Sequence, residues 1–449
     1  MTEAQTSTSI STRLSRIAEQ ARTAPDMALT NLAHHVDVTL LKEAFRRTRK
    51  DGAVGSDGQT ANEYAANLDS NLQQVWERAK TGRYRAPAVR RVHIPKGDGH
   101  KTRPIGIPTF EDKVVQRAYA MVLEAVYEQD FLPCSYGFRP KRSAHDAVQD
   151  LWDGMARMGG GWVLDVDIKG FFDHLDHTCL REILAKRVRD RGIHRMVGKW
   201  LNAGVLEDGV ISRPEAGTPQ GGVISPLLAN IYLHEVIDTW FEWTVKPRLR
   251  GRAFMIRYAD DFVMVFSDRY DADRVLSVLP SRLGKYGLTM HPDKTQMVPF
   301  RRPRRGTDGK GGGGRPGTFE FLGFTHYWGR SRRGRWVVKR RTARSRLARA
   351  VRALHQWTKQ HRHWRIAEQH RALSQKLRGH YAYYGITGNA DALERVYRLA
   401  IRAWRRWLDR RNHQRKMTWD RMNRLLERYP LPRPIVVHSI YRRVANATP

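Results

Sequence analysis

Carboxylates gather at two places in the sequence, each within a run of apolar residues. Asp165 and Asp167 end the run GWVLDVD, and Asp260 and Asp261 interrupt the longer run at 253–266. Adjacent like charges repel one another, so a protein that holds them together needs a compensating cation. Mg2+ prefers carboxylates, waters and phosphates as ligands. Two such ions can activate a hydroxyl and stabilise a leaving group in phosphoryl transfer.

Strands are the elements that must position these carboxylates. Alternate residues of a strand share a face, so Asp165 and Asp167 are expected to point the same way. The run AFMIRYADDFVMVF predicts two apolar strands joined by a polar tip, with Asp260 and Asp261 at the turn. Convergence of the two segments would bring three carboxylates together. For one pair taken alone, a second interpretation stays open, namely aspartates that only cap strand ends and turns.

The rest of the chain is expected to mix helices and strands. Residues 1–30 are polar and are expected to be loose. The Gly- and Arg-rich segment 301–318 predicts a loop, and FEFLGFTHYW after it predicts a strand or hairpin. The remaining expectations, in chain order, are helices over 30–85 broken by a turn at 50–60, strand–turn–strand over 89–108, a helix over 111–130, and helices from 341 onward.

The composition is that of a folded and strongly basic protein. Apolar residues make up 41% of 449, enough for two or three packed domains. Eighty Lys and Arg against 45 Asp and Glu leave a net charge of +35, which attracts polyanions and predicts a nucleic-acid partner. Two cysteines cannot build a Cys-rich zinc site or a disulfide framework, which fits a reducing compartment. No run of about 18 apolar residues occurs, so no membrane span is expected.

The strongest basic stretch is 330–349, which carries ten Lys and Arg and no acid. We expect it to open the C-terminal helical region and to bind RNA through Arg340, Arg341 and Arg344. Aromatic residues are interleaved further on, as suits structured RNA with unstacked bases. An ordinary helical bundle with a Trp core and an Arg surface remains the alternative for many of them.

Several motifs resemble those of one family. YADD at 258–261 resembles the Tyr-x-Asp-Asp signature of reverse transcriptases, and DIKGFFDHLDH at 167–177 resembles their first metal-binding motif. GTPQGGVISPLLANIYL at 217–233 resembles the motif packed beneath the incoming nucleotide, in the Gln-Gly-x-x-x-Ser-Pro form typical of group II intron enzymes. Further similar segments follow the family's order: 50–60, 93–118, 135–148, 287–296, 319–324 and 377–389. This ordered series is much more specific than one motif, and the chain is identified as a member of the group II intron-encoded reverse transcriptase/maturase family.

The resemblance implies an α+β fold of the right-hand polymerase type. Fingers and a palm with an antiparallel sheet would be followed by an α-helical thumb and maturase domain. The implied domains are an N-terminal extension at 1–60, fingers and palm at 61–325, thumb and maturase domain X at 326–410, and a short basic C-terminal region at 411–449. A His-Asn-His nuclease domain with paired cysteines, which many relatives carry, is not expected here, as in group IIC-type enzymes.

The resemblance also implies a metal site. Asp167, Asp260 and Asp261 would hold two Mg2+ ions, with Mn2+ as an alternative, and Ile168 would add its backbone carbonyl. Asp165 would tune the site or merely be solvated. These roles make the three aspartates the catalytic residues.

Five further residues match positions that handle the nucleotide in the family. Lys96 and Arg103 would clamp the triphosphate, since Arg offers a planar fork and Lys a point charge. Phe172 would crowd a ribose 2′-OH and select deoxynucleotides, with Phe171 assigned to the core. Gln220 would contact the nascent base pair from below, and Lys294 would lie near the leaving pyrophosphate, although an ordinary surface lysine looks identical.

The implied function is RNA-directed DNA polymerisation combined with maturase activity. Its partners would be dNTPs, an RNA template with a DNA or RNA primer, group II intron RNA whose splicing and mobility it assists, and target DNA contacted by the C-terminal region. A bacterial cytoplasmic, nucleoid-associated location follows. Two alternatives remain open: a domesticated relative that acts in DNA repair or phage defence, and a splicing-only RNA-binding maturase. The sequence leaves open the oligomeric state and the role of Arg257, which precedes YADD.

Overall fold

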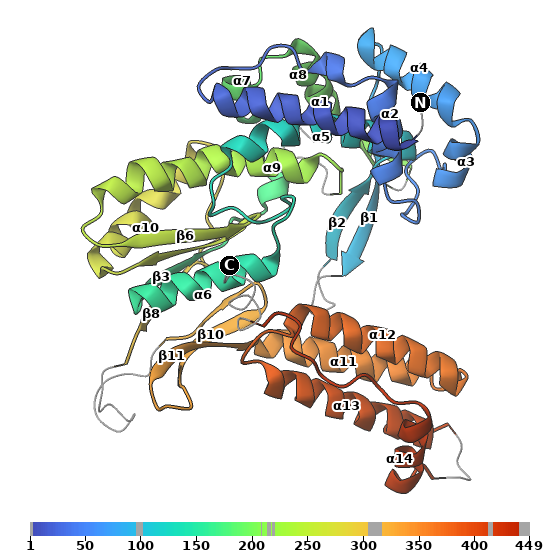
Figure 1. Ribbon diagram of the computed structural model, residues 1–449, viewed down its shortest axis with the longest axis vertical. Coiled ribbons are helices and arrows are strands. Elements are labelled where there is room, and N and C mark those ends of the chain that lie inside the picture. The colour runs from blue at the N-terminus through green and yellow to red at the C-terminus, as the bar shows by residue number, and fades with distance from the viewer. Residues whose placement is uncertain are drawn as a thin grey trace. The chain divides into compact units, whose positions relative to one another are not determined.

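The computed structural model describes residues 3–95, 102–207, 209–212, 217, 221–303, 317–411 and 416–439 (Figure 1). The chain divides into two compact units. The first comprises Met1–Ala147 and Leu164–Met297, and the second comprises Val148–Val163 and Val298–Pro449. Helices and strands alternate without a repeating order in both units, so the fold is of the expected α+β class.

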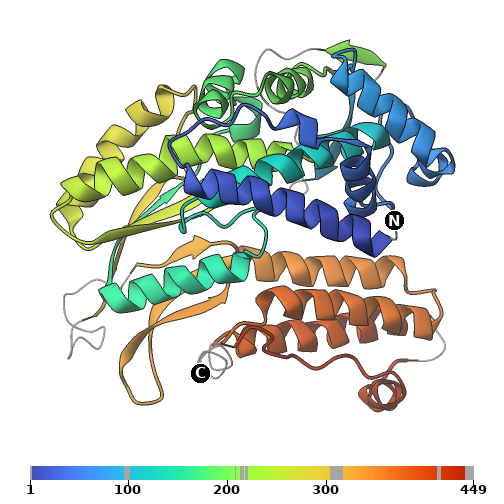
Figure 2. The ribbon, with the colours of Figure 1, turned by 45° about the horizontal axis from the view of Figure 1, so that its top comes forward.

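The first unit opens with helices, and the first of them corrects an expectation. Residues 1–30 were expected to be loose, but α1 spans Glu3–Thr23 and lies against α5 (Figure 2). Ile10, Ile17 and Ala21 are buried on one face, at the seven- and four-residue spacing of an amphipathic helix. The Ser- and Thr-rich start of the segment obscures this pattern. Three more helices follow as expected: α2 Val38–Arg47, α3 Ala61–Ala66 and α4 Leu68–Lys80.

A four-stranded sheet and three further helices belong to the first unit. β1 (Val89–Pro95) and β2 (Thr102–Ile107) pair antiparallel, which confirms the strand–turn–strand prediction. The sheet has the order β2-β1-β4-β5. Its other strands and the neighbouring helices are β4 Val205–Glu207, β5 Val210–Ser212, α5 Phe110–Asp130, α7 His177–Arg187 and α8 Arg191–Leu201.

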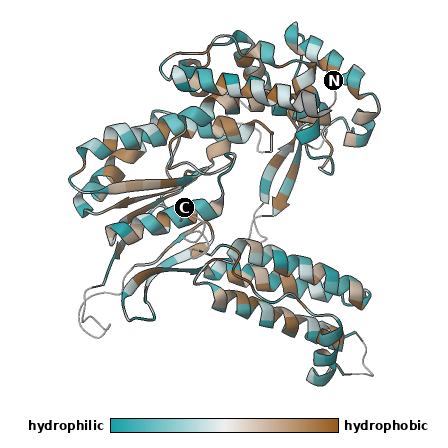
Figure 3. Ribbon diagram, in the orientation of Figure 1, coloured by the Kyte–Doolittle hydropathy of each residue, from teal (hydrophilic) through white to brown (hydrophobic). Residues whose placement is uncertain are grey.

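The second four-stranded sheet carries the carboxylates and has the order β6-β7-β3-β8. β6 (Ala253–Tyr258) and β7 (Asp261–Phe266) form the predicted antiparallel hairpin, and the ribbon in Figure 3 is coloured by the hydropathy of each residue along it. β3 spans Gly160–Val166 and β8 spans Gln296–Arg301. The helices that follow in the first unit are α9 Ser225–Leu233 and α10 Arg269–Gly284, with π-helical turns at His234–Asp238 and Trp240–Val245.

The second unit contains α6 (Ala144–Met158) from Val148 onward, a three-stranded sheet and a helical bundle. The sheet has the order β11-β10-β9, and β9 (Phe319–Phe321) and β10 (Phe324–Arg330) form the predicted hairpin. The stretch 330–349 was expected to open the helical region, but β11 occupies Trp336–Thr342. This segment pairs antiparallel with β10. The alternate residues Val338, Arg340 and Thr342 are buried, as expected for one face of a strand. The helices are α11 Arg344–Gln360, α12 Ile366–Tyr384, α13 Ala390–Asp409 and α14 Trp419–Arg428.

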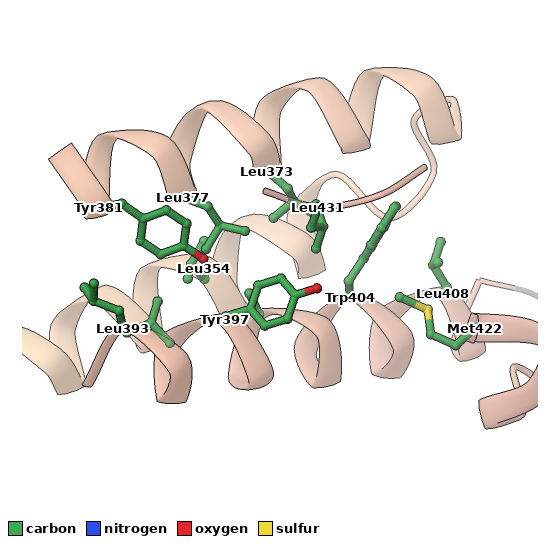
Figure 4. Close-up of a cluster of buried hydrophobic side chains, with 12 residues drawn as sticks. Leu354, Leu373, Leu377, Tyr381, Leu393, Tyr397, Trp404, Leu408, Met422 and Leu431 are labelled. Atoms are coloured by element: carbon green, nitrogen blue, oxygen red, sulfur yellow. The ribbon is translucent and has the colours of Figure 1, made fainter. Parts of the chain in front are cut away.

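An apolar cluster packs helices α11 to α14 of the second unit together (Figure 4). Tyr381 and Trp404 lie within it, so the interpretation as core residues is confirmed for these two aromatics. The Trp404 Nε1 donates to Gln369 Oε1 at 2.9 Å, which satisfies the indole N–H inside the core. The members of the cluster are Leu354, Leu373, Leu377, Tyr381, Leu393, Val396, Tyr397, Ala400, Trp404, Leu408, Met422 and Leu431.

The domain boundary expected at 325/326 stays a prediction, and the two compact units are divided at other positions of the chain. The longer segment of the second unit begins at Val298 and includes β9, β10 and β11. The Trp152 Nε1 on α6 donates to the Val338 carbonyl on β11 at 2.7 Å, and the Tyr383 hydroxyl on α12 donates to the Leu322 carbonyl at 2.9 Å. Among the described residues, no helix has both the length and the apolar character needed to cross a membrane.

Candidate active site

Asp167 lies directly after the buried strand β3, in a segment held by residues 289–291. The His291 amide donates to the Asp167 carbonyl at 2.8 Å, and the Lys169 amide donates to the Thr289 carbonyl at 2.8 Å. These two bonds do not involve the carbonyl of Ile168, whose side chain is buried at 3% exposure. The backbone around Asp167 is therefore fixed, while its carboxylate stays partly exposed.

Lys294, which was predicted to lie near the leaving pyrophosphate, contacts the carboxylate of Asp167. Its Nζ is 2.8 Å from the Asp167 Oδ2, and both side chains remain open to solvent, at 58% and 31% exposure. Asp165 lies two residues earlier, within hydrogen-bonding distance of Gln296, whose Nε2 is 3.4 Å from the Asp165 Oδ2. Asp165 thus faces the neighbouring strand β8.

The second carboxylate pair stands at the tip of the β6–β7 hairpin. Tyr258 pairs with Asp261 across the hairpin, so Ala259 and Asp260 form a two-residue turn. Ala259 has a φ of 56°, which is a left-handed conformation that costs an alanine roughly 1 kcal/mol. Gly137 packs directly against this turn, because a Cβ on Gly137 would lie 2.3 Å from the Ala259 nitrogen. The turn is therefore both strained and closely supported.

The pKa of Asp260 is affected by charged residues of other segments. Its pKa is raised, chiefly because burial removes water from the carboxylate. The negative charge of Asp167 raises this pKa further, while the positive charges of Arg103 and Lys294 lower it. Asp167 and Asp260 therefore act on one another electrostatically, and two of the predicted basic residues act on the same carboxylate. β3 and β7 are neighbours in the sheet, which accounts for this convergence.

Two glycines of the GTPQGG motif dock this segment onto its neighbours. Gly217, at a φ of 92°, lies against the backbone of Phe172 and Asp173, since an added Cβ would be 2.9 Å from both carbonyl oxygens. Gly221, at a φ of 119°, lies against Gly106 of β2, with an added Cβ 2.5 Å from its carbonyl oxygen. The motif thus joins the segment after Asp167 to the strand that carries Arg103. Gln220 and Lys96 lie outside the described residues.

The two phenylalanines after Asp167 have different surroundings. Phe171 is 2% exposed and packs edge-on against Tyr232, which confirms its assignment to the core. Phe172 is only half-buried and contacts Phe171 with ring centroids 5.2 Å apart. The backbone of Phe172 borders Gly217. Of the two rings, that of Phe172 is therefore the more exposed.

The three arginines predicted to bind nucleic acid do not share one environment. Arg340 is 4% exposed, and its guanidinium donates to the Val148 carbonyl at 3.2 Å and to Gln149 Oε1 at 3.1 Å. This burial corrects the expectation for Arg340, because alternation along β11 directs its side chain inward. Arg341 is exposed beside the Tyr327 ring, and Arg344 is exposed at the start of α11.

Arg257, whose role the sequence left undecided, is a buried ion-pair partner. Its Nη2 lies 2.6 Å from the Asp238 Oδ2, and both side chains are 0% exposed. The sequence contained no signal for Asp238, because it stands well upstream of the hairpin, in a π-helical turn. The sequence motifs therefore did not identify Asp238 as the partner of Arg257.

The residues present fit Mg2+. No three His, Cys, Asp or Glu side chains within the described ranges lie close enough together to form a metal cluster. Mg2+ does not need such a cage, because it commonly binds through one or two carboxylates together with waters and substrate phosphates. Asp167 and Asp260 supply hard oxygen ligands, and their mutual repulsion is a cost that a divalent cation removes. In this structure the Lys294 ammonium takes up part of that charge.

Carboxylates at the ends of neighbouring strands, with basic side chains around them, are an arrangement used by metal-dependent phosphoryl-transfer enzymes such as polymerases. The comparison with known families is more specific. Residues 94–326 match the family described as reverse transcriptase (RNA-dependent DNA polymerase). The chain belongs to this family.

Relatives with established names point to group II introns. Group II intron-encoded protein LtrA of Lactococcus lactis subsp. cremoris is 41% identical over 169 residues, which are 37% of this chain and 28% of that protein. Protein YkfC of Escherichia coli K12 is 34% identical over 284 residues, covering 56% and 74%. Nuclear intron maturase 1, mitochondrial, of Arabidopsis thaliana is 34% identical over 94 residues, covering 21% and 13%. The match thus spans less than a third of the LtrA chain, and the name of LtrA supports the resemblance to group II intron-encoded proteins.

Proposed function

We propose that this protein is an RNA-directed DNA polymerase that adds dNTPs to the 3′ end of a primer. One observation carries the proposal. Asp167, directly after β3, and Asp260, in the turn before the neighbouring strand β7, lie at the same sheet in a chain of the reverse transcriptase family, and the charge of Asp167 raises the pKa of Asp260. The basic residues Arg103 and Lys294 act on the same carboxylate, as a site for a polyphosphate requires.

Asp167, Asp260 and Asp261 are the proposed metal ligands, with the backbone carbonyl of Ile168 as a further one. Two bound Mg2+ ions, or Mn2+ in their place, would supply the activation of the primer hydroxyl and the stabilisation of the leaving pyrophosphate. The chain's own contribution is to hold the carboxylates in place before substrate arrives. The fixed backbone after β3 and the supported turn at Ala259 serve this purpose.

The remaining site residues are proposed to handle the nucleotide. Arg103 and Lys96 bind the triphosphate, and Phe172 crowds the position of a ribose 2′-OH. Gln220 contacts the nascent base pair, within a segment that Gly217 and Gly221 dock on both sides. Lys294 donates a proton to the pyrophosphate, for which it must leave the Asp167 carboxylate that it contacts here.

The proposed architecture is the right hand of polymerases. The β1–β2 hairpin with its helices would form the fingers, the β6-β7-β3-β8 sheet the palm, and helices α11 to α13 the thumb and maturase domain. In the domain assignment, 1–60 is the N-terminal extension, 61–325 the fingers and palm, 326–410 the thumb and domain X, and 411–449 the basic C-terminal region. The proposed location of this activity is the bacterial cytoplasm, at the nucleoid.

A maturase role is the second part of the proposal. The names of LtrA and of the Arabidopsis maturase support it, as does the net charge of +35. The partners would be group II intron RNA, an RNA template with its primer, and target DNA. A domesticated relative in DNA repair or phage defence would keep the polymerase without the intron, whereas a splicing-only protein would keep RNA binding without polymerisation.

Primer extension on an RNA template with Mg2+ and dNTPs tests the proposed activity. The wild-type protein should extend the primer, and the double variant Asp260→Asn with Asp261→Asn should not. Asp273→Asn is a matched control, because it removes an exposed carboxylate from α10 and should leave extension intact. Absence of extension by the folded wild-type protein, with tight RNA binding retained, would favour the splicing-only alternative instead.

A further inference from the structure

Arg257 is a fully buried arginine whose side-chain N–H groups all have partners. The Nε and one Nη2 proton go to the two carboxylate oxygens of Asp238, at 2.7 and 2.6 Å. The Nη1 donates to Asn230 Oδ1 at 2.9 Å and to the Ala259 carbonyl at 3.1 Å. The other Nη2 proton goes to Ser135 Oγ at 2.7 Å. These bonds account for all five donors of a guanidinium.

The partners of Arg257 come from three parts of the first unit, because α9 runs directly into the π-helical turn. Ser135 precedes α6, Asn230 lies in α9, and Asp238 ends the π-helical turn His234–Asp238. Ala259 belongs to the turn that presents Asp260. The guanidinium is therefore the point at which these elements are joined to the carboxylate turn.

Backbone hydrogen bonds also link Arg257 to the segment that contains Ser135. The Arg257 amide donates to the Cys134 carbonyl at 2.8 Å, and the Tyr136 amide donates to the Arg257 carbonyl at 2.9 Å. Asn230 Nδ2 donates to the Gly137 carbonyl at 2.7 Å, and Gly137 packs against the Ala259 nitrogen. The segment 134–137 thus supports the turn from one side, while β7 pairs with Arg257 on the other.

The ion pair is a costly way to fill this position. A buried pair loses the hydration of both charges, and well-packed apolar residues often stabilise a protein more. The planar guanidinium donates to five acceptor atoms in fixed directions, so it constrains the orientation of these groups. Apolar packing cannot impose such an orientation. One of the five acceptors is the carbonyl of Ala259, the strained residue directly before the proposed metal ligand Asp260.

We propose that Arg257 is a positioning residue that holds the Ala259–Asp260 turn in its left-handed conformation, so that the Asp260 carboxylate stays directed to the metal site that it shares with Asp167. The guanidinium touches neither substrate nor metal and acts through the Ala259 carbonyl. This inference rests on the proposed polymerase function. It adds Asp238, Asn230 and Ser135 to the residues on which that function depends.

The test compares Arg257→Lys with Arg187→Lys. Lysine keeps the charge but cannot form the fork. Arg187 is a matched control, because it is also buried at 7% exposure, pairs with Asp130 through two nitrogens and donates to backbone carbonyls, but far along the chain from YADD. Both variants should melt at a lower temperature than the wild type.

The decisive readout is Mn2+ binding to the protein without nucleic acid, measured from the electron paramagnetic resonance signal of free Mn2+. Arg257→Lys should raise the dissociation constant about tenfold or more, as loss of support for a metal ligand does elsewhere. Arg187→Lys should leave it unchanged. In primer extension, Arg257→Lys should lower kcat while KM for the dNTP stays within about twofold, because Arg103 and Phe172 stand on other segments.

A second variant covers the case in which Arg257→Lys does not fold. Ser135→Ala removes one bond to the guanidinium and should weaken Mn2+ binding less, in the same direction. A folded Arg257→Lys with wild-type Mn2+ affinity and kcat overturns the inference, as does a Ser135→Ala variant with unchanged Mn2+ affinity if the lysine variant cannot be prepared. Failure of the wild type to extend primers, in contrast, would refute the proposed function and leave the Mn2+ comparison intact.

Discussion

At the scale of single residues, the two phenylalanines after Asp167 are expected to respond differently to truncation. Phe172→Ala should raise incorporation of ribonucleotides, because the half-buried ring borders the proposed sugar position. The measurement is primer extension with competing dNTPs and rNTPs. Phe171→Ala is the control: it should cost about 3 to 5 kcal/mol of folding free energy without changing sugar selection. Equal selectivity of Phe172→Ala and wild type would remove this residue from the pocket.

A buried acid on α5 gives a prediction about pH. Asp112 accepts hydrogen bonds from the Tyr84 hydroxyl at 2.6 Å, the Trp200 Nε1 at 2.8 Å and the Gln116 Nε2 at 2.9 Å. These donors favour the charged carboxylate, but burial outweighs them and raises the pKa of Asp112 to about 6. The folded state therefore binds this proton more tightly than the unfolded chain, in which the carboxyl has its ordinary pKa of 3.8.

The sign of the effect follows from that difference. The stabilisation is complete below about pH 4 and is lost as the pH rises through about 6, on the order of 3 kcal/mol in total. Urea unfolding at several pH values should show the wild type losing stability relative to Asp112→Asn across this window. A constant difference between the two proteins from pH 4 to 7 would contradict the raised pKa.

At the scale of elements, the segment 217–222 is expected to depend on close contact with β2. Gly221→Ala forces a Cβ to within 2.5 Å of the Gly106 carbonyl oxygen, so the segment must move. Gly209→Ala is a matched control, because Gly209 also has a positive φ but nothing within 4 Å of an added Cβ. Single-nucleotide incorporation should fall about a hundredfold for the first variant, as a misplacement near 1 Å can cause. It should stay close to wild type for the second.

The elements also show what the sequence could and could not predict. The β6–β7 hairpin and β3 were predicted from apolar runs close to their observed bounds, and the C-terminal region was predicted to be helical without bounds for its single helices. α1 was missed because Ser and Thr dominate its polar face, although Ile10, Ile17 and Ala21 have helical spacing. β11 was missed because its run of basic residues resembles a solvated surface, and only pairing with β10 shows that Arg340 points inward.

The candidate site divides in the same way. Asp167, Asp260 and Lys294 were predictable because each stands in a motif of its own segment, and the sheet then brings β3 and β7 together. The network behind the turn was not predictable. Asp238 and Ser135 are distant from Arg257 in the chain and meet it only through folding.

At the scale of the whole molecule, the net charge of +35 predicts RNA binding that weakens with salt. Neutralising the exposed Arg341 and Arg344 to Gln should lower affinity for structured RNA and reduce the slope of log K against log salt by about two. The double variant of Arg269 and Arg274 on α10 is a matched control and should change the slope less if binding is centred on the second unit. Unchanged affinity for the Arg341 and Arg344 variant would remove that surface from the interface.

Arg340 belongs outside this set because it is buried. Arg340→Gln should lower the free energy of unfolding rather than the salt dependence, since the guanidinium bonds to Val148 and Gln149 inside the second unit. Chemical denaturation alongside RNA binding separates these two effects. A stable Arg340→Gln protein with a reduced salt slope would show that this arginine reaches RNA after all.

The most direct test of the account is to locate the metal ions in the working complex. Crystals of the protein with an RNA template, a primer that lacks its 3′ hydroxyl, the next dNTP and Mn2+ would show Mn2+ by anomalous scattering. The account predicts two peaks roughly 4 Å apart, with Asp167 and Asp260 among their ligands and Lys294 displaced from Asp167. Peaks bound elsewhere, or an Asp167 carboxylate that still pairs with Lys294 beside a bound dNTP, would contradict it.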